Sequence, residues 1–282
     1  MPDAAAGQAP SHILRQSGLR PRKGLGQNFL QDGRVARRIV EGLGIVGDEV
    51  VVEVGPGTGV LTSSLVDSGA KIVAIELDAN LASLLKERYP EDRLTVVHAD
   101  VLAVDPCELV PGGYKLVGNI PYYITGSIIR HFLESPCPPL VMVFMVQREV
   151  AERMVAGPGS MSLLSVSVQL YARAEIIARV PAGAFYPRPK VDSAVVRLVP
   201  QPPPLPRSLI DTFFRVARAG FGMKRKQLAN SLSHRLSISR TDVGALLAQA
   251  GIDPSRRAET LTVDDWVRVT RAYASLPAGE PA

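Results

Sequence analysis

The stretch VVVEVGPGTG, residues 50–59, joins a nearly all-apolar run to a turn that contains three glycines. The run does not alternate between apolar and polar residues, which is typical of a strand covered by helices on both faces. A glycine-rich turn after such a strand lies at the carboxyl edge of the sheet, where open α/β sheets bind ligands. This stretch therefore predicts an α/β fold with a Rossmann-like sheet and a ligand site at that edge.

Short β-branched runs alternate with longer helix-compatible segments on either side of this stretch, as in a parallel sheet with crossover helices. We predict strands at 50–54, 71–76, 94–98, 115–118 and 140–147, and helices at 59–68, 79–89, 125–134, 148–156 and 161–171. The runs 175–180 and 193–199 are joined by a connection too short for a crossover helix. They are predicted to form an antiparallel hairpin at one edge of the mostly parallel sheet.

A proline-rich segment divides the chain. Residues 201–206, QPPPLP, cannot continue a helix or a strand and form a stiff linker. We predict a flexible tail over residues 1–22, a ligand-binding domain over 23–200 and a small all-α domain over 207–282. Its helices are predicted at 207–219, 223–234, 240–250 and 263–275.

Positive charge is concentrated in two regions of this chain, whose net charge is +5. Eight basic residues and one acid lie between positions 205 and 240, and a second basic region precedes position 40. Such regions suit a polyanion such as nucleic acid. On charge alone, solvated helix faces explain them equally well.

The sequence lacks the features of membrane proteins, secreted proteins and metal-binding proteins. No apolar run approaches the ~20 residues of a membrane span, and the N-terminus does not resemble a secretory signal. A cytoplasmic location is expected. Cys107 and Cys137 lack metal-ligand spacing and are expected to be reduced thiols, and no metal site is predicted.

The ends of successive strands distinguish between cofactors. A dinucleotide fingerprint would need glycine where Val60 stands. Glu76 ends the next strand and can accept from two ribose hydroxyls, and Asp100 ends the one after it and can accept from an adenine amine. With no phosphate-binding lysine, this pattern predicts a nucleoside site of the kind that S-adenosylmethionine requires. Helix capping is the competing interpretation of both acids.

The stretch GNIPYY, residues 118–123, ends a strand at the same edge. The side-chain oxygen of Asn119 and the backbone carbonyl of Pro121 can accept both hydrogens of an adenine N6 amine. This would expose the lone pair of the amine to a methyl donor. Tyr122 can stack on a base that is flipped out of its helix or loop. Catalysis would then rest on positioning and electrostatics.

Five segments together resemble the bacterial small-subunit ribosomal RNA adenine-N6,N6-dimethyltransferase family, whose members are class I S-adenosylmethionine-dependent methyltransferases. The resemblance runs from about residue 22 to residue 272. The segments are GQNFL at 26–30, the glycine-rich turn at 53–59, NIPY at 119–122, AFYPRPKVDS at 184–193 and KRKQLANSL at 224–232.

The resemblance implies roles for individual residues. Asn28 and Leu30 would close over the methionine end of the cofactor, and Asn119 would lie between the cofactor and the target adenine. Phe185 would be the second ring around that adenine, opposite Tyr122. The rest of the cofactor site would consist of Gly55, Gly57, Glu76 and Asp100, and the RNA-binding residues would be Arg22, Lys23, Lys224, Arg225 and Lys226.

The implied reaction is dimethylation of two adjacent adenosines near the 3′ end of 16S rRNA, within an immature small subunit and with a role in its biogenesis. The enzyme is expected to be a monomer. A macrolide-resistance methyltransferase acting on 23S rRNA is the first alternative, although KRKQLANSL and RRAETLTVDDW at 256–266 disfavour it. A non-catalytic assembly factor is the second. A nicotinamide-dependent dehydrogenase is disfavoured by Val60.

Overall fold

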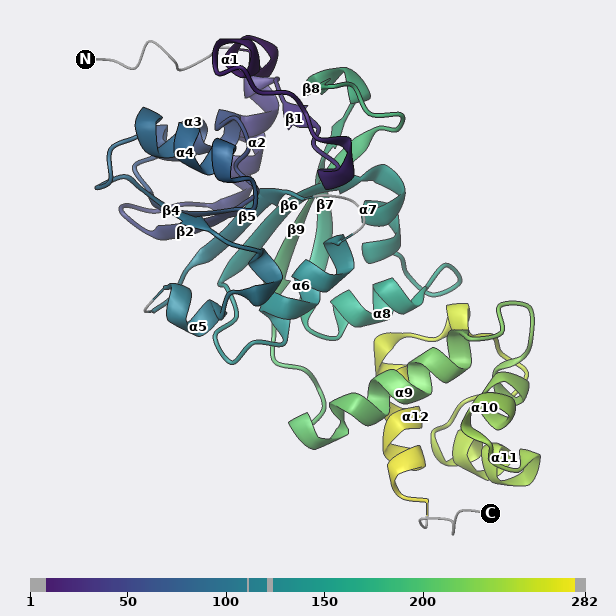
Figure 1. Ribbon diagram of the computed structural model, residues 1–282. Coiled ribbons are helices and arrows are strands. Elements are labelled where there is room, and N and C mark those ends of the chain that lie inside the picture. Colours follow the sequence, from purple (N-terminus) through teal and green to yellow (C-terminus); the bar gives the residue numbers. More distant parts are fainter. Residues whose placement is uncertain (1–8, 111, 121–123, 277–282) are drawn as a thin grey trace. The chain divides into compact units, whose positions relative to one another are not determined.

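The computed structural model describes residues 9–110, 112–120 and 124–276 (Figure 1). The chain forms two compact units. The first contains Met1–Ala151 and Arg173–Pro200, and the second contains Glu152–Ala172 and Gln201–Ala282.

The first unit is built on a seven-stranded sheet with the order β4-β3-β2-β5-β6-β9-β7. The first five strands in that order are parallel, and β9 runs antiparallel to β6. The predicted mixed α/β sheet is therefore confirmed. The strands are β2 Val50–Val54, β3 Lys71–Glu76, β4 Leu94–His98, β5 Lys115–Asn119, β6 Val141–Gln147, β7 Ala172–Val180 and β9 Ser193–Pro200.

The strand order reverses beside β2. The chain moves outward from β2 to β3 and β4, then returns to place β5 on the other side of β2. A crevice forms at such a switch point, outside the carboxyl ends of the strands. The glycine-rich turn and GNIPYY follow β2 and end β5, so the topology brings them together.

Helices α2 Gly33–Leu43, α3 Val60–Asp67 and α4 Ala79–Arg88 share a hydrophobic core with the sheet. Ile39, Leu65 and Leu85, one from each helix, are buried in it. Asp32 and Asp78 cap α2 and α4 by accepting from the backbone N–H two residues later. The first unit also contains α5 Pro106–Leu109 and α6 Thr125–Leu133, and α7 Arg148–Met154 begins there.

The N-terminal segment differs from the prediction of a flexible tail over residues 1–22. Helix α1 spans Pro10–Gln16 and buries Ile13 and Leu14. Leu14 packs in a cluster with Phe29 and Leu81, and this burial holds the segment on the first unit. The segment predicted as a tail therefore contains a helix at residues 10–16, and residues 1–8 lie outside the described part of the chain.

Two very short strands form a second sheet that the sequence did not predict. Strand β1, Phe29–Leu30, pairs antiparallel with β8, Phe185–Tyr186. Phe29 lies opposite Tyr186, and Leu30 lies opposite Phe185. The GQNFL and AFYPRPKVDS segments are therefore neighbours in space.

The second unit is helical, as predicted. Its helices are α8 Leu163–Gln169, α9 Ile210–Phe221, α10 Leu228–Leu236, α11 Arg240–Gln249 and α12 Val263–Ala274. Trp266 is fully buried in its core. The predicted second helix of the all-α domain, 223–234, begins five residues late, so Lys224, Arg225 and Lys226 lie in the turn before α10.

Residues 152–172 belong with these helices, whereas the sequence placed them in the domain 23–200. Helix α8 packs against α9. The backbone N–H of Gln201 donates to the carbonyl of Tyr171 at 2.7 Å. The division after Pro200 is common to the prediction and the structure.

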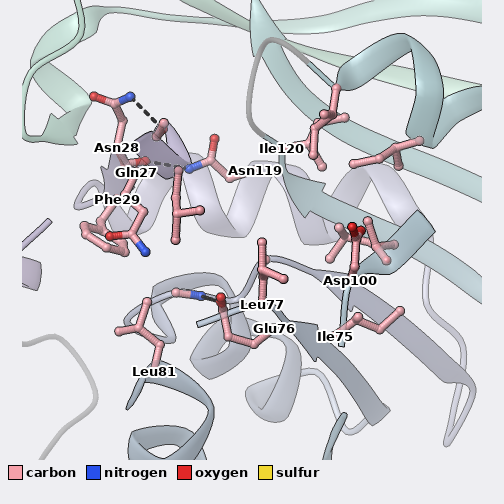
Figure 2. Close-up of a pocket in the computed structure, with 18 of the residues that line it drawn as sticks. Gln27, Asn28, Phe29, Ile75, Glu76, Leu77, Leu81, Asp100, Asn119 and Ile120 are labelled. Atoms are coloured by element: carbon pink, nitrogen blue, oxygen red, sulfur yellow. Dashed lines mark hydrogen bonds between the residues drawn. The ribbon is translucent and has the colours of Figure 1, made fainter. Parts of the chain in front are cut away.

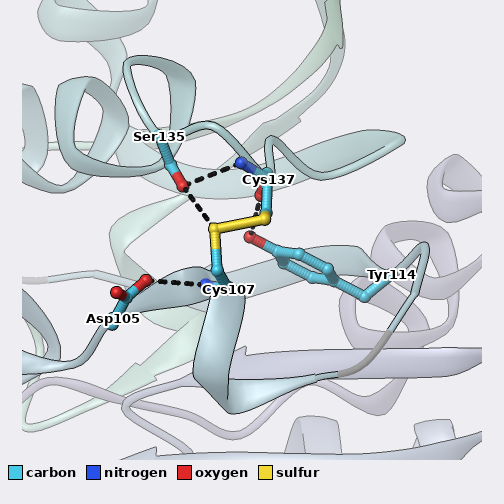
Figure 3. Close-up of a disulfide and its surroundings, with 5 residues drawn as sticks. All are labelled: Asp105, Cys107, Tyr114, Ser135 and Cys137. Atoms are coloured by element: carbon cyan, nitrogen blue, oxygen red, sulfur yellow. Dashed lines mark hydrogen bonds between the residues drawn. A yellow bond between two sulfur atoms is a disulfide. The ribbon is translucent and has the colours of Figure 1, made fainter.

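The two cysteines correct another prediction. Cys107 and Cys137 form a disulfide (Figure 3) instead of two reduced thiols. Their Cα atoms are 5.2 Å apart although 30 positions separate them in sequence. The Tyr114 hydroxyl donates to the Cys137 carbonyl at 3.1 Å, and Asp105 accepts from the Cys107 N–H at 2.8 Å. Sequence spacing alone did not reveal that the start of α5 and the segment after α6 bring the two residues together.

Within the described residues, no helix is both long enough and apolar enough to cross a membrane.

Candidate active site

A pocket of about 840 Å³, counting its open mouth, lies at the carboxyl ends of the parallel strands (Figure 2). Four strand ends and the segment before β1 supply its walls. Polar and glycine residues in the lining are Gly26, Gln27, Asn28, Gly55, Gly57, Glu76, Asp100 and Asn119, and apolar ones include Leu25, Phe29, Ile75, Leu77, Leu81, Val101, Ile120, Ile124 and Ile128.

Two glycines form the turn after β2. Gly55 has φ 65° and Gly57 has φ 59°, both in the left-handed region. A Cβ on Gly57 would also lie 2.9 Å from the ring of Phe29, which is too close for any side chain. Glycine at position 57 therefore allows β1 to pack over the turn.

Glu76 is tied to that turn. Its Oε2 accepts from the Gly57 N–H at 3.1 Å, and its Oε1 accepts from the Asp78 N–H at 2.9 Å. Only 6% of the residue is exposed. Burial raises the pKa of this carboxyl, while the two backbone N–H groups lower it. Each oxygen retains a further lone pair, so the carboxylate can also accept from ribose hydroxyls.

Asp100 was interpreted either as an acceptor for an adenine amine or as a helix cap, and its position in the structure is compatible with both. Its Oδ1 caps a short 3-10 helix, Val101–Ala103, by accepting from the Leu102 N–H at 3.0 Å. The residue also lines the pocket, and Figure 2 shows it on the wall formed after β4. A carboxylate has more acceptor sites than one cap uses, so capping leaves acceptor capacity for an adenine amine.

Asn119 ends β5 and is held by the N-terminal segment. Its side-chain Nδ2 donates to the backbone carbonyl of Asn28 at 2.8 Å. The Asn28 side chain in turn donates to the Gly26 carbonyl at 3.1 Å. Because the amide nitrogen of Asn119 is committed to a carbonyl, its Oδ1 is the end left to accept from a substrate amine.

The segment before β1 is also attached to Asp78, the residue that caps α4. Arg22 forms an ion pair with Asp78, with Nη1 and Oδ2 3.2 Å apart. Gln27 links the same two residues, since its Oε1 accepts from the Arg22 N–H at 2.8 Å and its Nε2 donates to Asp78 Oδ2 at 3.4 Å. Arg22, predicted to bind RNA, therefore contacts a carboxylate of its own chain.

Leu30 and Phe185 are not among the residues that line the pocket. Leu30 is 4% exposed and Phe185 is 2% exposed, and both belong to the hydrophobic core of the first unit. Successive side chains of a strand point to opposite sides. Phe29 therefore reaches the pocket while Leu30 faces the core, and Tyr186 is exposed while Phe185 is buried.

Five predicted residues and one side chain lie elsewhere than in the described part of the first unit. Pro121 and Tyr122 lie outside the described residues, as does the side chain of Lys23. Lys224, Arg225 and Lys226 are in the second unit.

The sequence interpretation missed a buried acid near the site. Glu53 is 1% exposed and accepts from the Thr62 hydroxyl at 2.7 Å. Burial raises its pKa to about 8, opposed by the Thr62 hydrogen bond and assisted by the charge of Glu76. An acid within an apolar strand was the available signal.

The apolar walls were also missed. Leu77 and Leu81 follow Glu76 closely in sequence and could have been found from that proximity.

The charge of the lining fits S-adenosylmethionine. Within the described residues, two carboxylates line the pocket and no lysine or arginine does. This composition disfavours a phosphate-bearing ligand and suits a cationic nucleoside. Glu76 and Asp100 would hold the ribose and the adenine, and the apolar side chains would cover the faces of the base.

Known proteins are similar to this chain in sequence. A family model described as ribosomal RNA adenine dimethylase matches residues 18–275. A Ribosomal RNA small subunit methyltransferase A of Dehalococcoides mccartyi is 44% identical over 265 residues, covering 92% of this chain and 90% of the relative. The protein of that name in Enterococcus faecalis is 41% identical over 275 residues, covering 92% of each.

Two solved structures have a similar fold. A dimethyladenosine transferase from Plasmodium falciparum has a TM-score of 0.72 at 24% identity, covering 86% of this chain and 95% of that one. The 23S rRNA methyltransferase ErmE has a TM-score of 0.70 at 30% identity, and the match covers 88% of this chain and 100% of the ErmE chain. The chain described here belongs to the ribosomal RNA adenine dimethylase family of S-adenosylmethionine-dependent methyltransferases.

Proposed function

We propose that this enzyme dimethylates N6 of two adjacent adenosines near the 3′ end of 16S rRNA in an immature small ribosomal subunit. The observation that carries the proposal is the hydrogen bond from Asn119 to the Asn28 carbonyl at the rim of the cofactor pocket. It turns an acceptor oxygen toward the place where an adenine amine would enter.

The chain's own residues then account for the chemistry. S-adenosylmethionine, when bound, supplies an electrophilic methyl group. Asn119 Oδ1 accepts one hydrogen of the N6 amine and thereby draws electron density onto the nitrogen. The predicted partners in this step are the Pro121 carbonyl for the second hydrogen and Tyr122 for stacking. Orientation and electrostatics supply the rate enhancement.

The small subunit is proposed over 23S rRNA because the relatives quoted above at 41–44% identity are named as small-subunit methyltransferases, whereas ErmE is 30% identical. A role in small-subunit biogenesis, a cytoplasmic location and a monomeric state belong to the same proposal. A metal-free reaction does too.

The basic turn that contains Lys224, Arg225 and Lys226 is proposed to bind rRNA phosphates, together with Lys23 and Arg22. For Arg22, this requires exchange of its Asp78 partner for a phosphate. The helical domain 207–282 would then position the substrate, and the first unit would carry the reaction. Phe185 keeps its proposed stacking role only if β8 moves to expose its ring.

Transfer of labelled methyl groups from S-adenosylmethionine tests the proposal. The substrates are unmethylated small subunits and unmethylated large-subunit RNA, with an Asn119→Ala variant as the catalytic control. Dimethyladenosine in the small subunit, abolished in the variant, is the expected result. Label in the large-subunit RNA instead would assign the protein to the resistance enzymes. Binding of subunits with no transfer would leave a non-catalytic assembly factor.

A further inference from the structure

Three arginines surround a second pocket, which lies within the helical unit. It measures about 810 Å³ with its open mouth included. Arg215 and Arg218 come from α9, Arg235 comes from the end of α10, and Tyr273 of α12 completes the wall. None of these residues belongs to the basic turn at 224–226.

Neutral groups hold two of the guanidinium groups in place. Arg215 Nη2 donates to the Tyr273 hydroxyl at 2.8 Å, and its guanidinium carbon lies 4.9 Å from the centroid of the tyrosine ring. Arg235 Nη2 donates to the Gly222 carbonyl at 3.4 Å. These interactions fix the orientation of the cations without neutralising them.

The pocket arginines lack acidic partners. Over residues 9–110, 112–120 and 124–276, no carboxylate forms an ion pair within 4.0 Å of Arg215, Arg218 or Arg235. Elsewhere in the same unit, Asp265 pairs with both Arg256 and Arg268. Within the described residues, acids of this unit therefore form ion pairs with other arginines and not with these three.

Helix ends explain only part of this arrangement. Arg218 and Arg235 lie in the last turns of α9 and α10, where the helix dipole favours a cation. Arg215 lies in the middle of α9 and gains nothing from that effect. Converging unpaired guanidinium groups repel one another, and an anion placed between them would remove that cost.

We propose that this pocket binds a phosphodiester group of RNA, at a place separate from the basic turn. The guanidinium groups offer paired N–H donors that match phosphate oxygens. The Tyr273 hydroxyl, which accepts from Arg215, has its own hydrogen left to donate. Gly222, the partner of Arg235, lies two residues before Lys224, so the pocket and the basic turn are close enough to serve phosphates of one RNA strand. The inference rests on the proposed function, which supplies the RNA.

The test compares two double variants that each remove two positive charges. Arg218→Gln with Arg235→Gln alters the pocket. Arg93→Gln with Arg257→Gln alters exposed arginines outside it. Binding of each protein to unmethylated small subunits is measured at several salt concentrations, with methyl transfer by the wild-type enzyme assayed in parallel. The pocket variant should bind small subunits at least about tenfold more weakly than the wild type. The slope of the logarithm of its association constant against the logarithm of the salt concentration should be shallower by about one for each phosphate that it no longer neutralises.

The outcomes are distinct. Equal weakening of the two double variants would overturn the pocket proposal, whereas weaker binding by the pocket variant alone supports it. Urea unfolding confirms that each variant is folded. Tyr273→Phe keeps every charge but frees Arg215, and should weaken binding with the salt slope unchanged; unaltered binding would count against the pocket. If the wild-type enzyme methylates no small subunit, the proposed function fails. Binding of the two double variants to an RNA oligonucleotide then still tests whether the pocket binds a phosphodiester group.

Discussion

The side-chain amide of Asn119 donates to the backbone carbonyl of Asn28 at 2.8 Å, which joins the end of β5 to the segment before β1. One hydrogen bond therefore orients a residue proposed to be catalytic and holds a wall of the cofactor pocket. A disturbance of either residue should affect both the reaction and the closure of the pocket.

Asn119→Asp tests this coupling. The substitution keeps an acceptor for the substrate amine but removes the donor, and it places a carboxylate against the Asn28 carbonyl. Leaving that carbonyl without its partner should cost about 1–3 kcal/mol. We expect a single-turnover rate reduced by about tenfold or more, with faster hydrogen exchange over residues 26–30. Asn80→Asp adds the same charge at an exposed position on α4 and should change neither quantity. A full rate with Asn119→Asp would refute the orienting role.

Asp78→Asn tests the ion pair with Arg22. Asparagine caps a helix as well as aspartate does, so α4 should remain intact. The ion pair is removed, and since the Arg22 side chain is 55% exposed this should cost under about 1 kcal/mol. We expect cofactor affinity to fall a few-fold at low salt and to become less sensitive to salt, as measured by calorimetry.

Asp32→Asn is the matched control for that change. Asp32 also caps a helix and also pairs with an arginine, Arg34, but this pair does not hold the segment before β1. Cofactor affinity should be unchanged in this variant. If the two variants behave alike, the Arg22 ion pair has no part in cofactor binding.

Glu53 should make stability depend on pH. Its pKa rises from 4.5 to about 8 on folding, so between these values the folded state retains a proton that the unfolded state has released. The stabilisation is fully present below pH 4.5 and disappears as pH rises through about 8. Its slope is at most about 1.4 kcal/mol per pH unit. Glu53→Gln should flatten this dependence in urea unfolding between pH 5 and pH 8, and an unchanged slope would show that Glu53 does not bind the proton.

Two helical glycines should respond oppositely to alanine. A Cβ on Gly220 would lie 2.3 Å from the ring of Trp266, whereas one on Gly244 would meet nothing within 4 Å. Gly220→Ala should lower the free energy of unfolding by about 1–3 kcal/mol through overpacking. Gly244→Ala should raise it by about 0.5–1 kcal/mol through helix propensity. Thermal unfolding of the two variants, compared with the wild type, checks both signs.

The predicted site residues that line the pocket each come from one continuous segment. The glycine-rich turn, Glu76, Asp100 and Asn119 follow strands whose apolar character is plain, and the parallel topology brings strand ends to one edge. The sequence alone was therefore sufficient to predict the sheet and most of the polar lining.

The parts that were missed depend on interactions between distant segments. A two-residue strand has no periodicity to detect, so the pairing of β1 with β8 left no sequence signal. Without that pairing, the sequence could not show that Leu30 and Phe185 face the core. The ion pair of Arg22 with Asp78 and the disulfide were missed for the same reason.

The pairing of β1 with β8 also determines when the pocket can be completed during synthesis. Residues 27–29 line the pocket, but the strand that pairs with β1, Phe185–Tyr186, follows more than 150 residues later in the chain. Until then, the segment over the glycine-rich turn has no strand to pair with. Nascent chains that end before β8 therefore carry the five parallel strands and their acids but lack the strand that pairs with β1, so the pocket is completed late in translation.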